Sequence, residues 1–265
     1  MKFEDILNQI SDEKSPSEII ISDTWAQGHT VFGGLSSALL YKAMRIKVNP
    51  SRVLRSMNTS FVSALKVDVP FRIHVEILRE GRSVTQVISR AIQNDQVCVL
   101  IQASFGKSRD SRINVPAKSK PTVKPAKMGV MARYKEGFTP PFLQYFDISV
   151  CRGDVPFSNS KYDEIGGWIR FNNAKEVSSD EHIIAMIDAW PAPTLQMYDG
   201  YAPSSSLSWN LEFIHPHSKL NADSWFAYEA ITRQAASGYC HTEANFWNES
   251  GELVAISRQA VVSYQ

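Results

Sequence analysis

The chain has 265 residues, of which 43% are hydrophobic and 21% are charged, and its 28 Lys and Arg residues nearly balance 27 Asp and Glu residues, giving a net charge of +1. This composition is typical of a globular protein with a sizeable core, and it excludes a chain that is disordered throughout. The balanced charge argues against a nucleic-acid partner, because such proteins usually carry a strong basic excess.

Neither a membrane span nor a secretory leader is expected. The longest apolar runs, such as 97–101, are far too short to cross a bilayer, and residues 1–5 carry acids where a signal peptide needs an apolar stretch. The three cysteines are widely spaced and form no Cys-x-x-Cys motif. We interpret Cys98, Cys151 and Cys240 as buried thiols of a cytoplasmic protein.

The first half of the chain predicts a strand, a helix and then several strands. A β-rich run at 19–21 precedes a Gly33-Gly34 step, which leads into apolar residues at helical spacing. Strands rich in Val, Ile and Phe then extend to Phe105. Turns between them are expected at Glu80-Gly81 and Asn94-Asp95.

A change in composition follows this half. From Lys107 to Lys127 the chain alternates Lys, Arg, Ser and Pro, and its prolines prevent a regular element. We therefore predict an exposed linker that divides the chain into domains. The expected bounds are 1–106 for the first unit, 107–160 for the linker and connecting segment, and 161–265 for the second unit.

The second half has the same predicted plan. A short strand at 168–171 precedes a helix that begins after Ser178, a capping residue three positions before Glu181, and ends before Pro191. Strands are expected at 205–214, 225–232, 239–247 and 253–263.

Matching residues support a duplication of one unit. Asn58 and Gln102 in the first half correspond to Asn210 and Gln259 in the second, in the same strand order and at nearly constant offsets. A long helix on a strongly curved antiparallel sheet is the simplest layered arrangement for such a unit. We predict an α+β protein built from two copies of it.

Familiar catalytic and cofactor motifs are missing from the sequence. It contains no Gly-x-Ser-x-Gly elbow, no phosphate-binding loop ending in Gly-Lys-Ser/Thr, and no Gly-x-Gly-x-x-Gly. His215 and His217 flank Pro216 at an expected loop edge. We therefore predict no metal site.

Three kinds of polar residue border apolar stretches in the second half. Asp188 lies one helical turn after Ile184, where a carboxylate needs a partner, and it serves either chemistry or the turn that follows. Ser206 and Ser208 are expected on one face of an alternating strand, which is either exposed or turned inward. Gln259 lies among apolar residues, so Asp188 or a water is expected to bind its amide.

Several motifs are shared with a known family. They are, in chain order, Val31-Phe32-Gly33-Gly34, the run Leu78-Arg79-Glu80-Gly81-Arg82-Ser83, the run Ala91 to Phe105, and Leu253-Val254-Ala255 followed by Gln259. Through them the chain resembles the acyl-CoA thioesterase II group of double-hotdog proteins, over about 31–105 and 167–264. The resemblance implies two tandem hotdog units, each a long helix on a curved antiparallel sheet, that form a double hotdog.

The resemblance also implies a function, hydrolysis of acyl-CoA thioesters to free acid and coenzyme A. The family's active site is an Asp, a Thr or Ser, and a Gln of the second unit, which match Asp188, Ser206 and Gln259. A water activated by Asp188 would attack the thioester, with the other two residues orienting it. Ser208 departs from the family pattern, because related members can carry an acid there.

Substrate-binding residues are expected in the first unit. Backbone N–H groups at Gly33 and Gly34 would polarise the thioester carbonyl, unless these glycines serve only close packing. Arg79 and Arg82 would bind the phosphates of coenzyme A, unless they are ordinary surface charges. No cofactor is expected, since coenzyme A is part of the substrate. A homo-oligomer and a role in fatty acid metabolism complete the expectation.

Two other functions remain open at this point. A hotdog hydratase or dehydratase needs an acid and a histidine at the helix, and His29 with Asp23 is the nearest pair in the sequence. A non-catalytic acyl-thioester-binding module would keep the fold without turnover, and the Ser208 departure is its basis.

Overall fold

The computed structural model describes residues 1–10, 18–172, 179–218, 221 and 223–264. The chain divides into two compact units. Unit 1 comprises Met1–Asn114, Tyr134–Leu143 and Ser179–Ala185, and unit 2 comprises Val115–Arg133, Gln144–Ser178 and Met186–Gln265. None of the described helices is long and apolar enough to span a membrane.

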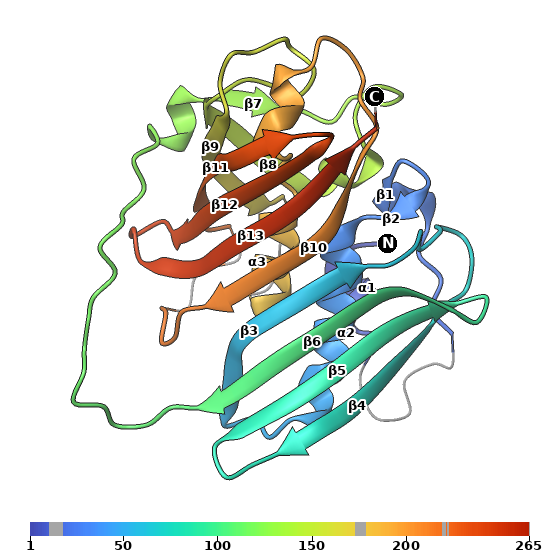
Figure 1. Cartoon of the computed structure of the whole chain (residues 1–265), viewed down its shortest axis with the longest axis vertical. Coiled ribbons are helices and arrows are strands. Elements are labelled where there is room, and N and C mark those ends of the chain that lie inside the picture. The colour runs from blue at the N-terminus through green and yellow to red at the C-terminus, as the bar shows by residue number, and fades with distance from the viewer. Residues whose placement is uncertain (11–17, 173–178, 219–220, 222, 265) are drawn as a thin grey trace. The chain divides into compact units, whose positions relative to one another are not determined.

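Unit 1 is a helix packed on an antiparallel sheet (Figure 1). Helix α2 (Gly33–Lys47) contacts β4 (Arg72–Glu80), β5 (Val84–Gln93) and β6 (Gln96–Lys107), and the sheet order is β4-β5-β6-β3 with β3 at Arg52–Phe61. The smaller elements are α1 (Phe3–Leu7), η1 (Asp23–Trp25) and the hairpin of β1 (Ala26–Gln27) and β2 (Thr30–Val31). The expected strand at 19–21 is wrong, since Ile19 makes only an isolated bridge to Phe71.

Both predicted turns of unit 1 are confirmed. Asn94 and Asp95 connect β5 to β6 with φ of 50° and 59°, the left-handed conformation that a two-residue hairpin turn requires. The turn after Glu80 connects β4 to β5 and is held by Arg52, which is only 8% exposed. Its guanidinium donates to the Gly81 carbonyl at 2.8 Å and to the Thr85 hydroxyl, and pairs with Glu80 at 3.4 Å.

We expect Arg52→Met to lower the free energy of unfolding by about 1–3 kcal/mol, because the Gly81 carbonyl and the Thr85 hydroxyl would lose a buried donor. Urea denaturation followed by circular dichroism measures the change. Arg72→Met is the control, since Arg72 forms an exposed ion pair with Asp95 that contributes about 0–1 kcal/mol. Equal losses in the two variants would contradict the structural role of Arg52.

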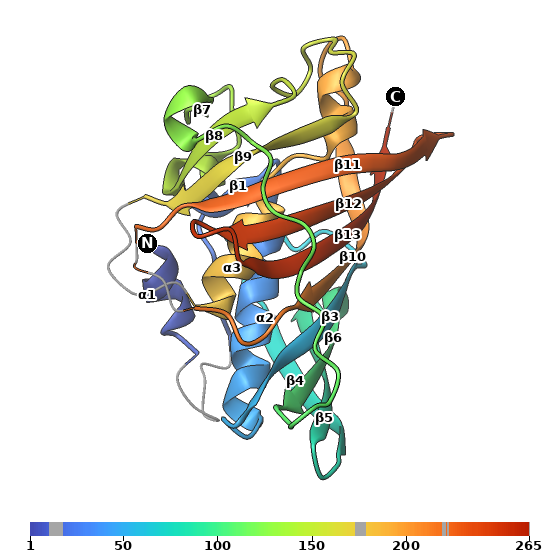
Figure 2. The same ribbon diagram turned by 90° about the vertical axis from the view of Figure 1, so that its left-hand side faces the viewer.

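Unit 2 contains a seven-stranded antiparallel sheet, whose strands lie side by side in Figure 2. Its order is β10 (Ser204–Phe213), β13 (Leu253–Ser263), β12 (Tyr239–Asn248), β11 (Phe226–Ala236), β9 (Glu164–Phe171), β8 (Phe146–Arg152) and β7 (Val130–Ala132). The order β11-β12-β13-β10 repeats the order β4-β5-β6-β3 of unit 1, and both sets follow a helix. The predicted duplication is therefore confirmed in the topology of the sheets.

The expected linker has no regular element from 108 to 125, as predicted. It is not a free connection, however. The backbone N–H groups of Thr122 and Val123 donate to the Glu229 carboxylate, and the Trp168 indole donates to the Lys124 carbonyl at 2.7 Å. Farther along, the segment expected to connect the units contributes η2 (Ala126–Met128), β7 and β8 to unit 2 and part of η3 (Pro141–Tyr145) to unit 1. The domain bounds given above stay a prediction.

The boundary between the units falls within helix α3 (Asp180–Asp188), because its residues up to Ala185 belong to unit 1 and the rest belong to unit 2. Within unit 1, the Tyr41 hydroxyl donates to Asp180 at 2.7 Å. The helix ends before Pro191, as predicted, and η4 (Pro193–Met197) follows. The predicted cap, Ser178, lies outside the described residues.

The cysteines are all free thiols. Cys98 and Cys240 are buried as predicted, whereas Cys151 is partly exposed, so that part of the prediction is wrong. The Cys151 side chain lies in β8, between β9 and β7, beside the Ser149 hydroxyl.

Candidate functional site

Asp188 and Gln259 meet in unit 2. Asp188 is the last residue of α3, and Gln259 lies in β13, 71 residues later in the chain. The Gln259 amide Nε2 donates to Asp188 Oδ1 at 3.0 Å. Both side chains are partly buried. The amide thus has the Asp188 partner that we predicted as one of two options.

Ser206 reaches the same face of the sheet through a β-bulge. In the pairing of β10 with β13, Ser206 lies opposite Val261 and Ser208 lies opposite Ala260, so Leu207 is an extra residue without a partner in the register. Paired residues point to the same side of a sheet, and so do residues two apart on one strand. Ser206 therefore shares a face with Val261 and hence with Gln259.

The bulge overturns one prediction. We expected Ser206 and Ser208 to share a face, but an extra residue reverses the alternation of the strand that contains it. Ser208 pairs with Ala260, which lies on the opposite face from Gln259. The departure from the family pattern at Ser208 is thus on the other side of the strand from the three candidate residues.

Trp209 anchors β10 next to this site. It is fully buried, it lies opposite Gln259 in the register, and its indole N–H donates to the Ser257 hydroxyl at 2.9 Å. A buried aromatic with a satisfied polar atom holds its strand in one position. Trp209 therefore holds β10 against β13 beside Gln259.

Two aromatic residues near Asp188 were not predicted from the sequence. Trp190 stacks on Tyr228 of β11, with ring centroids 5.0 Å apart and planes at 9°. Burial raises the pKa of Tyr228 well above its usual range, and the Asp188 charge raises it further, so the phenol stays protonated. No hydrogen-bond partner of the Trp190 indole N–H is found among the described residues. A lone Tyr in an apolar strand gave no pattern that would have identified this pair.

The arrangement of Asp188, Gln259 and Ser206 in unit 2 is suited to activating a water molecule. A carboxylate accepts about four hydrogen bonds, so the bond from Gln259 leaves Asp188 able to accept one from a water molecule. An amide and a hydroxyl on the same face can hold that water in place. Such a group of residues can remove a proton from water beside a reactive carbonyl.

The other predicted site residues belong to unit 1. Gly33 and Gly34 begin α2, and Gly34 has a packing role of its own, because an added Cβ would lie 2.5 Å from the Phe32 ring and 3.0 Å from the Ala185 Cα. Arg79 and Arg82 are exposed near the turn that Arg52 holds. Their predicted roles in substrate binding stay predictions.

The histidines that the sequence offered for a metal site or for acid–base chemistry lie outside the strand β13 that carries Gln259. His215 and His217 follow β10 and stack on each other, with ring centroids 4.7 Å apart. His29 and Asp23 are both exposed.

Comparison with protein-family models gives two matches that together cover most of the chain. Residues 21–106 match the acyl-CoA thioesterase N-terminal domain, and residues 117–263 match the acyl-CoA thioesterase C-terminal domain. No curated protein matches the sequence.

Solved structures share the fold at low sequence identity. A hot dog fold protein of unknown function from Alicyclobacillus acidocaldarius is 19% identical, with a TM-score of 0.83, and the match covers 99% of this chain and 98% of that one. The tesB protein of Mycobacterium avium subs paratuberculosis is 17% identical, with a TM-score of 0.75 and 100% of both chains covered. The acyl-CoA thioesterase II TesB2 of Mycobacterium marinum is 18% identical, with a TM-score of 0.73 and 99% and 98% covered. Each unit of this chain therefore has the hotdog fold, as predicted.

Proposed function

Because the chain belongs to the acyl-CoA thioesterase family, we propose that it hydrolyses acyl-CoA thioesters to the free acid and coenzyme A at Asp188, Ser206 and Gln259. The observation that carries this proposal is the 3.0 Å hydrogen bond between Asp188 and Gln259. It joins two of the three residues that the family resemblance implies, on the face to which the bulge turns Ser206.

The proposed reaction needs no covalent enzyme intermediate. Asp188 accepts a proton from a bound water while the water oxygen attacks the thioester carbonyl carbon. The tetrahedral intermediate then collapses, the carbon–sulfur bond breaks, and the proton passes from Asp188 to the departing coenzyme A thiolate. A thiol has a pKa of about 8.5, so its thiolate is a good leaving group and this second step is easy.

The neighbouring residues have separate roles in this reaction. Gln259 fixes the Asp188 carboxylate through its amide, and Ser206 orients the attacking water through its hydroxyl. Tyr228, which stays protonated, cannot add a second negative charge beside Asp188.

Release of free thiol from a panel of acyl-CoA esters, from short to long, tests the proposal. We expect Ser206→Ala to lower kcat/KM by about tenfold, the cost of one hydrogen bond to the water. Ser208→Ala is the matched control, because Ser208 is equally partly buried in the same strand but faces the other way. We expect its kcat/KM to stay within twofold of the wild type, and Ser206→Thr to retain activity.

Two results would contradict the proposal. Absence of thiol release from every ester, with acyl-CoA still bound, would favour the non-catalytic binding module. Equal losses in Ser206→Ala and Ser208→Ala would keep the reaction but remove Ser206 from its site.

A further inference from the structure

Positive charge is concentrated in one segment of unit 2. Residues 115–133, which we call the basic strap, contain five of the 28 Lys and Arg residues and none of the 27 Asp and Glu residues. The strap therefore carries a charge of +5, whereas the whole chain carries +1. Its five basic side chains are exposed, and none of them forms an ion pair with another described residue. They are Lys118, Lys120, Lys124, Lys127 and Arg133.

The backbone of the strap is fixed to the sheet of unit 2. The Trp247 indole of β12 donates to the Ser119 carbonyl at 3.2 Å, and the Trp168 indole of β9 donates to the Lys124 carbonyl at 2.7 Å. Figure 2 shows the segment crossing the strands of unit 2. The basic side chains are therefore presented on an ordered backbone, which lowers the entropy that a partner must overcome on binding.

A carboxylate beneath the strap also holds it. Glu229 of β11 accepts the Val123 N–H at 2.8 Å and pairs with Arg152 at 3.4 Å. Because Arg152 neutralises this acid, Glu229 leaves the positive charge of the strap largely undiminished.

The strap lies on the face of the sheet opposite to Gln259. Phe246 pairs with Ala255, and Gln259 follows Ala255 in two steps of two residues, so Phe246 and Gln259 point to the same face. Trp247 is next to Phe246 in β12 and points to the other face, where its indole binds the strap. A partner docked on the strap would leave the Gln259 face uncovered.

Exposed apolar side chains lie among the basic ones. Met128 is 62% exposed, Val130 is 69% exposed and Met131 is 39% exposed, whereas the strap contains no aromatic residue and a single Arg. Sites for nucleic acids and hot spots for protein partners depend mainly on aromatic side chains and Arg. Lysines mixed with exposed aliphatic side chains instead suit a membrane surface, where anionic headgroups border an apolar layer.

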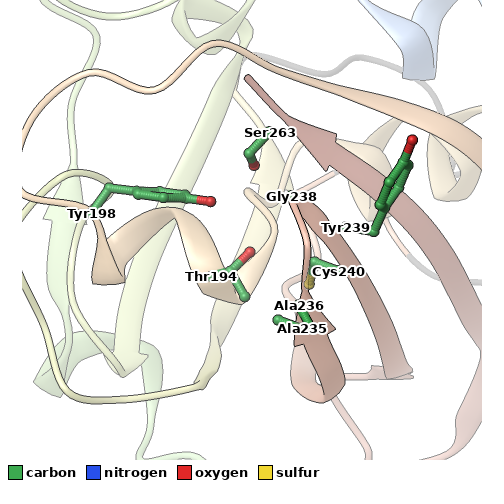
Figure 3. Close-up of a pocket in the computed structure, with 8 residues that line it drawn as sticks. All are labelled: Thr194, Tyr198, Ala235, Ala236, Gly238, Tyr239, Cys240 and Ser263. Atoms are coloured by element: carbon green, nitrogen blue, oxygen red, sulfur yellow. The ribbon is translucent and has the colours of Figure 1, made fainter. Parts of the chain in front are cut away.

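A pocket in unit 2 offers no comparable charge. It lies where β11 turns into β12, and its volume is about 210 Å³ (Figure 3). Its lining carries no charged side chain and consists of Thr194, Tyr198, Ala235, Ala236, Gly238, Tyr239, Cys240 and Ser263. An anionic partner is therefore expected at the strap and not at this pocket.

We propose that the basic strap docks unit 2 onto the surface of a membrane that contains anionic lipids. The lysines contact the headgroups, and Met128, Val130 and Met131 enter the boundary of the acyl layer. Each basic residue near an anionic surface strengthens binding about fivefold, so several together hold the protein there reversibly. The inference is independent of the proposed function, because it concerns the other face of the sheet.

Cosedimentation of the full chain with lipid vesicles tests the inference. We expect binding to vesicles of phosphatidylcholine and phosphatidylglycerol in equal amounts, loss of this binding at high salt, and no binding to phosphatidylcholine alone. A triple variant of the strap should lower the partition coefficient by about 100-fold. Its substitutions are Lys118→Gln, Lys120→Gln and Lys127→Gln.

A second triple variant with the same change in net charge is the matched control. It removes exposed basic residues of unit 2 that lie outside the strap, through Lys161→Gln, Arg233→Gln and Arg258→Gln. We expect its partition coefficient to stay within about threefold of the wild type, because salt screens charges that lie away from the membrane. Thermal denaturation verifies that both triple variants are folded.

The apolar contact has its own test. Met128→Gln should lower the partition coefficient about fivefold, because a side chain that leaves water for the acyl boundary contributes hydrophobic free energy. Tyr239→Gln is the control, since Tyr239 lines the pocket in Figure 3 and is 49% exposed outside the strap. Vesicle binding that Met128→Gln leaves unchanged would overturn the choice of a lipid partner.

Three further results would overturn the inference. They are the absence of binding to the mixed vesicles, equal losses in the two triple variants, and binding to double-stranded DNA that depends on the strap and is tighter than binding to vesicles. The last result would assign the strap to a nucleic acid. Vesicle binding is measured without catalysis, so a wild type that releases no thiol would defeat the proposed function alone.

Discussion

Asp188→Asn is expected to lower kcat/KM for acyl-CoA hydrolysis by about 10²- to 10⁴-fold, because the amide cannot accept the proton of the attacking water. Asn has nearly the same shape as Asp and can still accept the 3.0 Å hydrogen bond from Gln259 through its carbonyl oxygen. The fold should therefore persist. Thiol release under subsaturating substrate measures the effect, and circular dichroism verifies the fold.

Asp199→Asn is the matched control for this prediction. Asp199 belongs to the same unit and is exposed, so the same chemical change there should leave hydrolysis within twofold of the wild type. If Asp188→Asn kept full activity while the wild type released thiol, another group would have to be the base. The bond between Asp188 and Gln259 would then be a structural one.

Trp209→Ala is expected to lower the free energy of unfolding by about 3–5 kcal/mol. The indole is fully buried, so its removal leaves a cavity and a Ser257 hydroxyl that has lost its donor. Urea denaturation followed by far-UV circular dichroism gives this number without relying on tryptophan fluorescence.

A partly exposed tryptophan supplies the comparison. Trp225 lies under the Arg170 guanidinium, 4.6 Å from its ring centroid, and it is not fully buried. We expect Trp225→Ala to cost clearly less than Trp209→Ala, because less apolar surface returns to water. A Trp209→Ala variant as stable as Trp225→Ala would show that Trp209 does not anchor the strand of the site.

Local patterns in the sequence identified most of the secondary structure. The helix before Pro191 and the turn at Asn94-Asp95 were predicted because proline and left-handed residues act on their immediate neighbours. The failure at Ile19 has the opposite cause. A short run of β-branched residues favours extended backbone, but only a partner strand makes it part of a sheet, and Ile19 has a single bridge.

The sequence by itself determined the duplicated plan of the chain and the identity of the candidate residues Asp188, Ser206 and Gln259. Only the tertiary structure decided how they are arranged. The contact between Asp188 and Gln259 joins residues 71 positions apart, and the direction of Ser206 depends on one extra residue, Leu207, in the pairing with another strand. A period-two pattern fixes side-chain direction only while the register is regular, so a bulge reverses the prediction. The stacking of Trp190 on Tyr228 likewise depends on which segments of the chain are neighbours in space, a property that no local pattern contains.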